Sequence, residues 1–110
     1  MSCACDVKQP IQTLVIDLSV TTITSSAWVQ LLAALLYAAG SVEIFNGSSS
    51  AFSLAMGSSG NEVALPYTVL PGGTNGIVSL SQLFKTGSRI SAKSIGGTPS
   101  QGLLIFNFYG

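Results

Sequence analysis

Hydrophobic residues occur along this chain in short runs, separated by glycine, serine, proline and asparagine. Between residues 11 and 20 the large apolar side chains fall on alternate positions, which is the period of a β-strand with one buried face. Similar short runs along the rest of the chain predict further strands. These predicted strands cover residues 41–46, 51–56, 62–70, 77–80, 88–95 and 103–109.

Three of the predicted strands carry more information than the alternation alone. One strand ends at Asn46-Gly47, a strong turn dipeptide, so we expect it to form a hairpin with the next predicted strand. Another contains Pro66, which has no N–H group, and we expect that strand at a sheet edge or at a bulge. The final strand is apolar on both faces, which predicts burial by the core on one side and by something else on the other.

One segment fits two structures. Its large apolar side chains have helical spacing, which predicts a short helix near residues 28–38, with Ser25 or Ser26 at its start and Gly40 at its end. The alternative is a strand over residues 27–33 followed by a loop, because every neighbouring segment is a strand. The residues in helical spacing are Trp28, Leu31, Leu32, Leu35 and Leu36.

Seven or eight short strands with frequent turns predict an all-β fold, an antiparallel β-sandwich or jelly roll. A chain of 110 residues is long enough for one domain with one core. We expect residues 11–110 to form this domain and residues 1–10 to form a flexible N-terminal arm. No apolar run reaches the roughly 20 residues that a membrane-spanning helix needs, and the first residues lack the apolar stretch of a signal peptide.

The low charge content favours a domain that is part of an assembly over a domain that is free in solution. The chain has four acidic and four basic residues and a formal net charge of zero, while 47% of it is hydrophobic. The absence of a basic stripe argues against nucleic-acid binding through phosphate neutralisation. A domain without a charged coat tends to associate with other proteins.

The same scarcity argues against an enzyme. Histidine is absent, so serine has no histidine to activate it as a nucleophile. The acidic residues are scattered, and Glu43 and Glu62 are the pair that could meet across strands. The chain has two cysteines, which are too few for a metal site without histidine. We therefore expect no catalytic residue, no metal and no cofactor.

A local positive cluster consists of Arg89 and Lys93, with Lys85 nearby in the sequence. It either contacts an acidic partner or a sugar, or it forms a solvated face. The stronger interaction signals lie at the two ends of the chain, where the cysteines can stay unpaired or form a disulfide to another subunit, and where aromatic side chains cluster as in protein interfaces. The predicted interface residues are Cys3, Cys5, Phe106, Phe108 and Tyr109.

Five stretches together carry a family resemblance: SVEIFN at 41–46, GSSGNEV at 57–63, PGG at 71–73, GSRISAK at 87–93 and GLLIFNF at 102–108. With these stretches, the chain from about Ala27 to its end resembles a family of small virion proteins of tailed bacteriophages. The resemblance implies a structural component without catalytic residues, such as a capsid cement or decoration protein or a small tail part. The chain departs from the family pattern at residues 46–50, where NGSSS replaces a more acidic turn, and in its unusually low charge.

The expected function is therefore that of a non-enzymatic virion protein, assembled in the host cytoplasm. It would stabilise the shell by binding between subunits of the major capsid protein, and it would itself form a homo-oligomer, by analogy a trimer. We expect neither nucleic acid nor a membrane as a partner. The alternative is a small tail or tail-fibre component, or an adaptor, that binds a host glycan or another tail protein. The predicted loops contain few aromatic residues, which counts against sugar binding.

Overall fold

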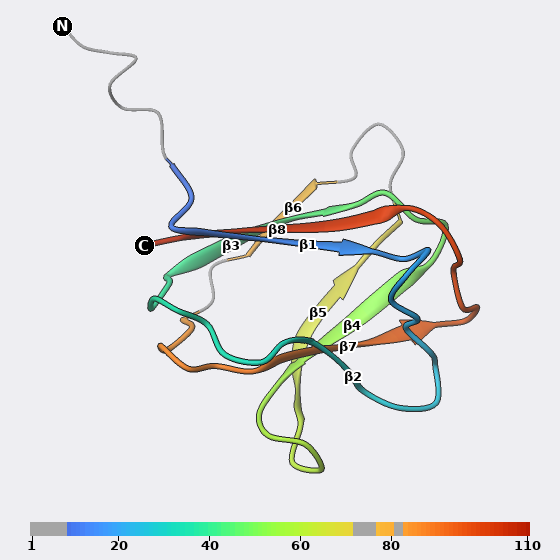
Figure 1. Cartoon of the computed structure of the whole chain (residues 1–110), viewed down its shortest axis with the longest axis horizontal. Coiled ribbons are helices and arrows are strands. Elements are labelled where there is room, and N and C mark those ends of the chain that lie inside the picture. The colour runs from blue at the N-terminus through green and yellow to red at the C-terminus, as the bar shows by residue number, and fades with distance from the viewer. Residues whose placement is uncertain (1–8, 72–76, 81–82) are drawn as a thin grey trace, which may run out of the picture.

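The chain folds into two four-stranded β-sheets that pack face to face (Figure 1). The structure is a computed structural model that describes residues 9–71, 77–80 and 83–110, with only the backbone described for 77–80. These residues contain eight strands and no helix. The strands are β1 (Gln12–Asp17), β2 (Val29–Leu32), β3 (Ser41–Asn46), β4 (Ala51–Met56), β5 (Val63–Val69), β6 (Ile77–Leu80), β7 (Ile90–Ile95) and β8 (Leu103–Tyr109).

The strand order identifies the sandwich as a jelly roll. One sheet has the order β1-β8-β3-β6 and the other has the order β2-β7-β4-β5, and all neighbouring strands are antiparallel. Consecutive strands change sheet at every connection except the one between β4 and β5. Two interleaved Greek keys of this kind form a jelly roll. The predicted all-β antiparallel sandwich is confirmed.

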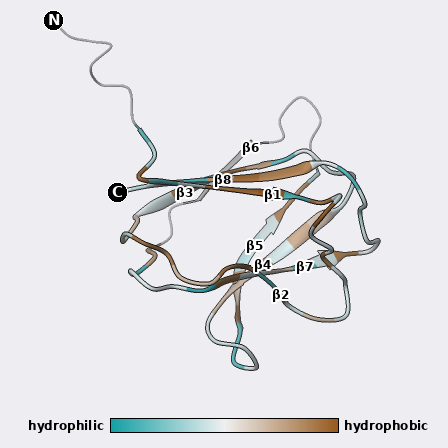
Figure 2. Cartoon of the chain, viewed as in Figure 1, coloured by the Kyte–Doolittle hydropathy of each residue, from teal (hydrophilic) through white to brown (hydrophobic). Residues whose placement is uncertain are grey.

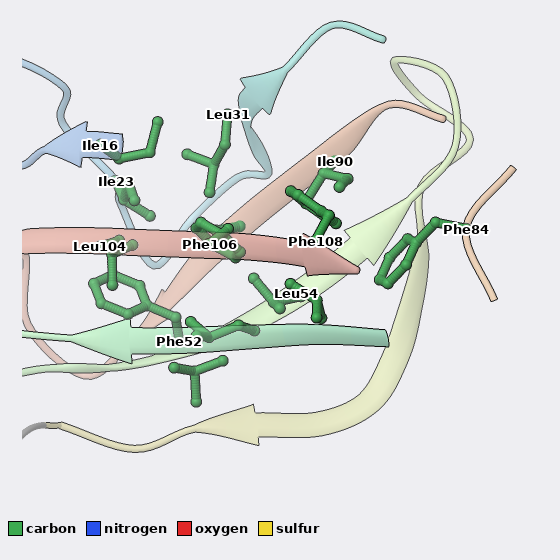
Figure 3. Close-up of a cluster of buried hydrophobic side chains, with 14 of the residues drawn as sticks. Ile16, Ile23, Leu31, Phe52, Leu54, Phe84, Ile90, Leu104, Phe106 and Phe108 are labelled. Atoms are coloured by element: carbon green, nitrogen blue, oxygen red, sulfur yellow. The ribbon is translucent and has the colours of Figure 1, made fainter. Parts of the chain in front are cut away.

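The core lies between the two sheets and follows from the alternation along each strand. Strand β8 contributes Leu104, Phe106 and Phe108, each no more than 1% exposed, and they face Phe52 and Leu54 of β4 (Figure 3). The Phe108 ring lies 6.3 Å from that of Phe106. Such close-packed aromatic side chains supply much of the apolar area that the fold buries.

The short helix expected near residues 28–38 is wrong, and the alternative of a strand followed by a loop is confirmed. Strand β2 pairs with β7, and the loop that follows it pairs its backbone with residues 83–88. Leu35 N–H donates to Ser88 O, and Ala39 and Phe84 form an isolated bridge. The backbone groups of the loop are thus bonded to a distant segment, which removes the need for helical bonds.

The predicted hairpin between β3 and β4 is also wrong, because the two strands belong to different sheets. Gly47 does not have the positive φ that a tight two-residue hairpin turn requires. Instead the fully buried Asn46 side chain holds the crossing segment. Its Nδ2 donates to Ser50 O at 2.8 Å and to Leu70 O at 3.1 Å, and its Oδ1 accepts from Ser48 N at 3.0 Å.

The expectation for Pro66 is confirmed. Its strand, β5, is an edge strand, and the β4–β5 pairing shifts register between Ser53 and Ala55. An edge position tolerates proline because the strand has no second neighbour that needs its N–H group. The predicted arm lies outside the described residues except for Gln9 and Pro10, and the loop at 72–76 lies outside them entirely.

Candidate protein-interaction surface

The outer face of the β1-β8-β3-β6 sheet carries a row of apolar side chains. Val15 of β1 is in register with Ile105 of β8, which is in register with Phe45 of β3. Val15 is 54% exposed, Phe45 is 38% exposed and Ile105 is partly exposed. We call these three residues the apolar band. Figure 2 shows hydrophobic residues along much of β1 and β8.

A polar row runs beside the apolar band on the same face. It contains Thr13, Asn107 and Glu43, which are in register across β1, β8 and β3. Thr13 Oγ1 donates a hydrogen bond of 2.8 Å to Asn107 Oδ1. The strands of this face include Asp17 and Glu43 but no lysine or arginine. The face therefore carries an apolar row beside a polar row, and the charged residues of its strands are acidic.

The outer face of the opposite sheet has a different character. Ser53 of β4 lies in register with Lys93 of β7 on one side and with Thr68 of β5 on the other. The Lys93 Nζ lies 4.6 Å from the centroid of the Trp28 ring, a cation–π contact. Lys93 shares this face with Ile95, which is 48% exposed, so the face combines small polar side chains, a charge and an exposed apolar side chain.

Arg89 is fully engaged within the molecule. Its Nε donates to Gln30 Oε1 at 2.8 Å, and its Nη1 donates to Gly57 O at 3.1 Å and to Glu62 Oε2 at 3.0 Å. The last contact is also an ion pair, in which the Arg89 and Glu62 side chains are 17% and 10% exposed. Arg89 therefore links β7 to β2 and to the β4–β5 loop, and we call this set the Arg89 clamp.

The pKa of Glu62 is lowered, and the Arg89 clamp contributes to this shift. Hydrogen bonding from the backbone N–H of Glu62 itself holds the pKa of this carboxyl below its ordinary value of 4.5, with further contributions from Arg89 and Gly60, while burial opposes the shift. The expected meeting of Glu43 and Glu62 is wrong, because Glu43 lies in β3 and Glu62 precedes β5 of the other sheet. The basic side chains do not form one cluster either, since Arg89 binds Glu62 and Lys93 lies on Trp28.

An open hollow of about 600 Å³ lies beside the Arg89 clamp. The only charged side chain among its described lining residues is Arg89, which already has its partners. Across the described residues, no group of three or more histidine, cysteine or acidic side chains is placed to hold a metal ion. In the same part of the chain no helix is long and apolar enough to cross a membrane. The described lining of the hollow is Ala33, Met56, Gly57, Ser58, Val63, Gly87, Ser88 and Arg89.

The predicted interface residues divide into three groups. Phe106 and Phe108 are 1% and 0% exposed, so this part of the prediction is corrected: they belong to the core and are not available to a partner. Tyr109 is half-buried and lies on the outer side of its strand. Cys3 and Cys5 lie outside the described residues.

Sequence reasoning missed Val15 and Phe45. The signal for Val15 was present, because an apolar residue stands between Thr13 and Asp17 on the face that otherwise reads as polar. Phe45 alternates in the same way with the buried Ile44. What the pattern did not contain was the register that places both residues beside Ile105.

Neither a scan against models of known protein families nor searches of curated proteins and solved structures found a match to this chain.

Proposed function

We propose that this protein is a non-enzymatic structural component of a virion that stabilises the shell by binding between subunits of the major capsid protein. The observation that carries the proposal is the apolar band, an exposed apolar row on the outside of a sheet. Exposed apolar rows of this kind are typical of surfaces that another protein covers.

Two further observations support the proposal. Jelly rolls are common among viral capsid domains, although fold alone does not define function. The sequence stretches that resemble small phage virion proteins include β8, which supplies the centre of the apolar band. Covering apolar area contributes about 25 cal/mol per Å², and a contact of modest size becomes strong when it is repeated over a shell.

The glycan-binding alternative has less support. The described lining of the hollow contains no aromatic side chain on which a sugar ring could stack, and its one charged side chain is bonded to Glu62. A tail component that binds another protein would also use the apolar band. The number of copies per particle distinguishes the two locations, because a shell protein is present in far more copies than a tail protein.

The test is to add the purified chain to shells assembled without it and to measure binding and the heat stability of the shells. We expect the wild-type chain to bind at many sites and to raise the temperature at which the shells break. Val15→Asp should reduce binding by at least about tenfold, because a carboxylate within a covered apolar contact costs more than 1.4 kcal/mol.

Thr68→Asp is the matched control, since it introduces the same charge at an exposed position of an edge strand on the opposite sheet. It should bind as the wild type does. Shells that bind no wild-type chain, or that distinguish neither variant from the wild type, would contradict the proposal.

A further inference from the structure

One end of the sandwich combines exposed apolar side chains with a lysine. The loop after β2 and residues 83–88 lie side by side there, joined by the bridge between Ala39 and Phe84 (Figure 1). Three large apolar side chains are exposed on these two segments, and the Lys85 side chain is exposed beside them. We call this set the basic end. It consists of Leu36 (64% exposed), Tyr37 (59%), Leu83 (67%) and Lys85.

A second set combines exposed apolar side chains with an aspartate. Val20, in the turn after β1, is 81% exposed, and Leu103, which is in register with Asp17, is 40% exposed. Asp17 Oδ1 accepts from Ser19 N at 2.9 Å and from Ser19 Oγ at 2.7 Å, which keeps the pKa of Asp17 below its ordinary value of 3.8 and orients the charged carboxylate. We call Asp17, Val20 and Leu103 the acidic end.

These two sets lie at opposite ends of strands β1 and β8. The basic end contacts the start of β1, where Leu36 N–H donates to Gln12 Oε1 at 3.0 Å. It also adjoins the end of β8, where Gly40 N–H donates to Tyr109 O. Asp17 and Leu103 are the last residue of β1 and the first residue of β8. In Figure 1 the loop after β1 and the loop after β2 accordingly lie on opposite sides of the sandwich.

The distribution of the other charges makes these two ends complementary. Among the described residues, Arg89 pairs with Glu62, Lys93 lies on Trp28, and Glu43 lies within the polar row. Of the charged side chains that the structure describes, the two that remain are Lys85 at one end and Asp17 at the other. Each of them stands beside large exposed apolar side chains. Both ends are therefore apolar around a single charge, and the two charges have opposite signs.

We propose that the basic end of one copy binds the acidic end of a second copy of this chain, with Lys85 facing Asp17. A contact between the same end of two copies would instead place Lys85 against Lys85 or Asp17 against Asp17, and such a pair of like charges is unfavourable. A head-to-tail contact of this kind builds a closed ring or an open row of copies. None of the residues named for the two ends belongs to the apolar band, so the contact goes beyond the proposed function and does not depend on it.

The experiment is sedimentation equilibrium of the full chain over a range of concentrations, with Val20→Lys and Lys85→Glu as variants. The wild type should show a mass that rises with concentration. Each variant places like charges in the contact and should need at least about tenfold more protein to reach the same mass. A mixture of the two variants should associate again, because the unaltered basic end of one fits the unaltered acidic end of the other.

Val63→Lys is the control, because Val63 is 69% exposed on β5 and belongs to neither end. It should associate as the wild type does. A wild-type chain that stays monomeric, a Val63→Lys variant as weak as the other two, or a mixture that stays monomeric would each overturn the head-to-tail contact. A monomeric chain that still binds shells would overturn this inference and leave the proposed function standing.

Discussion

Asn46 shows how one buried side chain directs the path of the chain. The dipeptide Asn46-Gly47 is typical of a hairpin turn, yet here the amide group of Asn46 binds the backbone of the crossing segment and of residue 70. Its side chain is fully buried, so each of these hydrogen bonds replaces a bond to water. The residue therefore fixes the point at which the chain leaves one sheet and enters the other.

Replacing Asn46 by alanine should lower the free energy of unfolding by about 2–3 kcal/mol, because it removes hydrogen bonds to the buried N–H group of Ser48 and to the partly buried carbonyl groups of Ser50 and Leu70. Asn46→Asp should be at least as harmful, since a carboxylate oxygen would face the carbonyl oxygens of Ser50 and Leu70. Urea denaturation measures both effects. Asn61→Ala, at an exposed turn, should change the free energy by no more than about 0.5 kcal/mol; equal effects at the two positions would refute the role given to Asn46.

At the scale of the element, β8 serves two surfaces at once. Its even-numbered residues, such as Phe106 and Phe108, are buried in the core, while Ile105 and Tyr109 lie on the outer face. Because β8 lies between β1 and β3, it has a paired neighbour on both edges. The strand is apolar on both faces, and only its outer face bears on the proposed contact with a partner.

Truncation should separate these two roles of β8. Phe108→Ala should lower the free energy of unfolding by about 3–5 kcal/mol, since it leaves a cavity beside Phe84 and Phe106. Ile105→Thr should cost much less stability, because Ile105 is partly exposed, but should weaken binding to shells. Chemical denaturation and the shell-binding measurement together check this; equal losses of stability would show that Ile105 also belongs to the core.

For the whole molecule, the few charges are arranged by surface. The two carboxylates with lowered pKa values lie in separate sheets, Asp17 at the end of β1 and Glu62 just before β5. The polar sheet carries the Arg89 clamp and the contact of Lys93 with Trp28, whereas the other sheet carries the apolar band. The charged side chains therefore lie in different surroundings on the two sheets.

The stability of the fold should fall in acid. The carboxyls of Asp17 and Glu62 have lower pKa values in the folded chain than their ordinary values of 3.8 and 4.5. As the pH falls through this range, the unfolded chain therefore binds more protons than the folded chain, and the folded state loses stability. The stabilisation is present above the ordinary pKa values and is lost as the pH falls through the lower pKa values of the folded chain. Denaturation midpoints between neutral pH and about pH 3 should decrease, and Glu62→Gln should flatten the decrease. An unchanged slope in Glu62→Gln would contradict this assignment.

The sequence by itself determined the all-β class and the strands other than β2, because alternation with a period of two is a local property of neighbouring residues. It also placed Pro66 at an edge or a bulge and showed that both faces of the final strand are apolar. Only the tertiary structure decided which sheet each strand joins, that the segment after β2 bonds to residues 83–88, and that Val15, Ile105 and Phe45 form one row. These features depend on hydrogen-bond partners far apart in the chain, and a local pattern does not specify which distant segment supplies the partner.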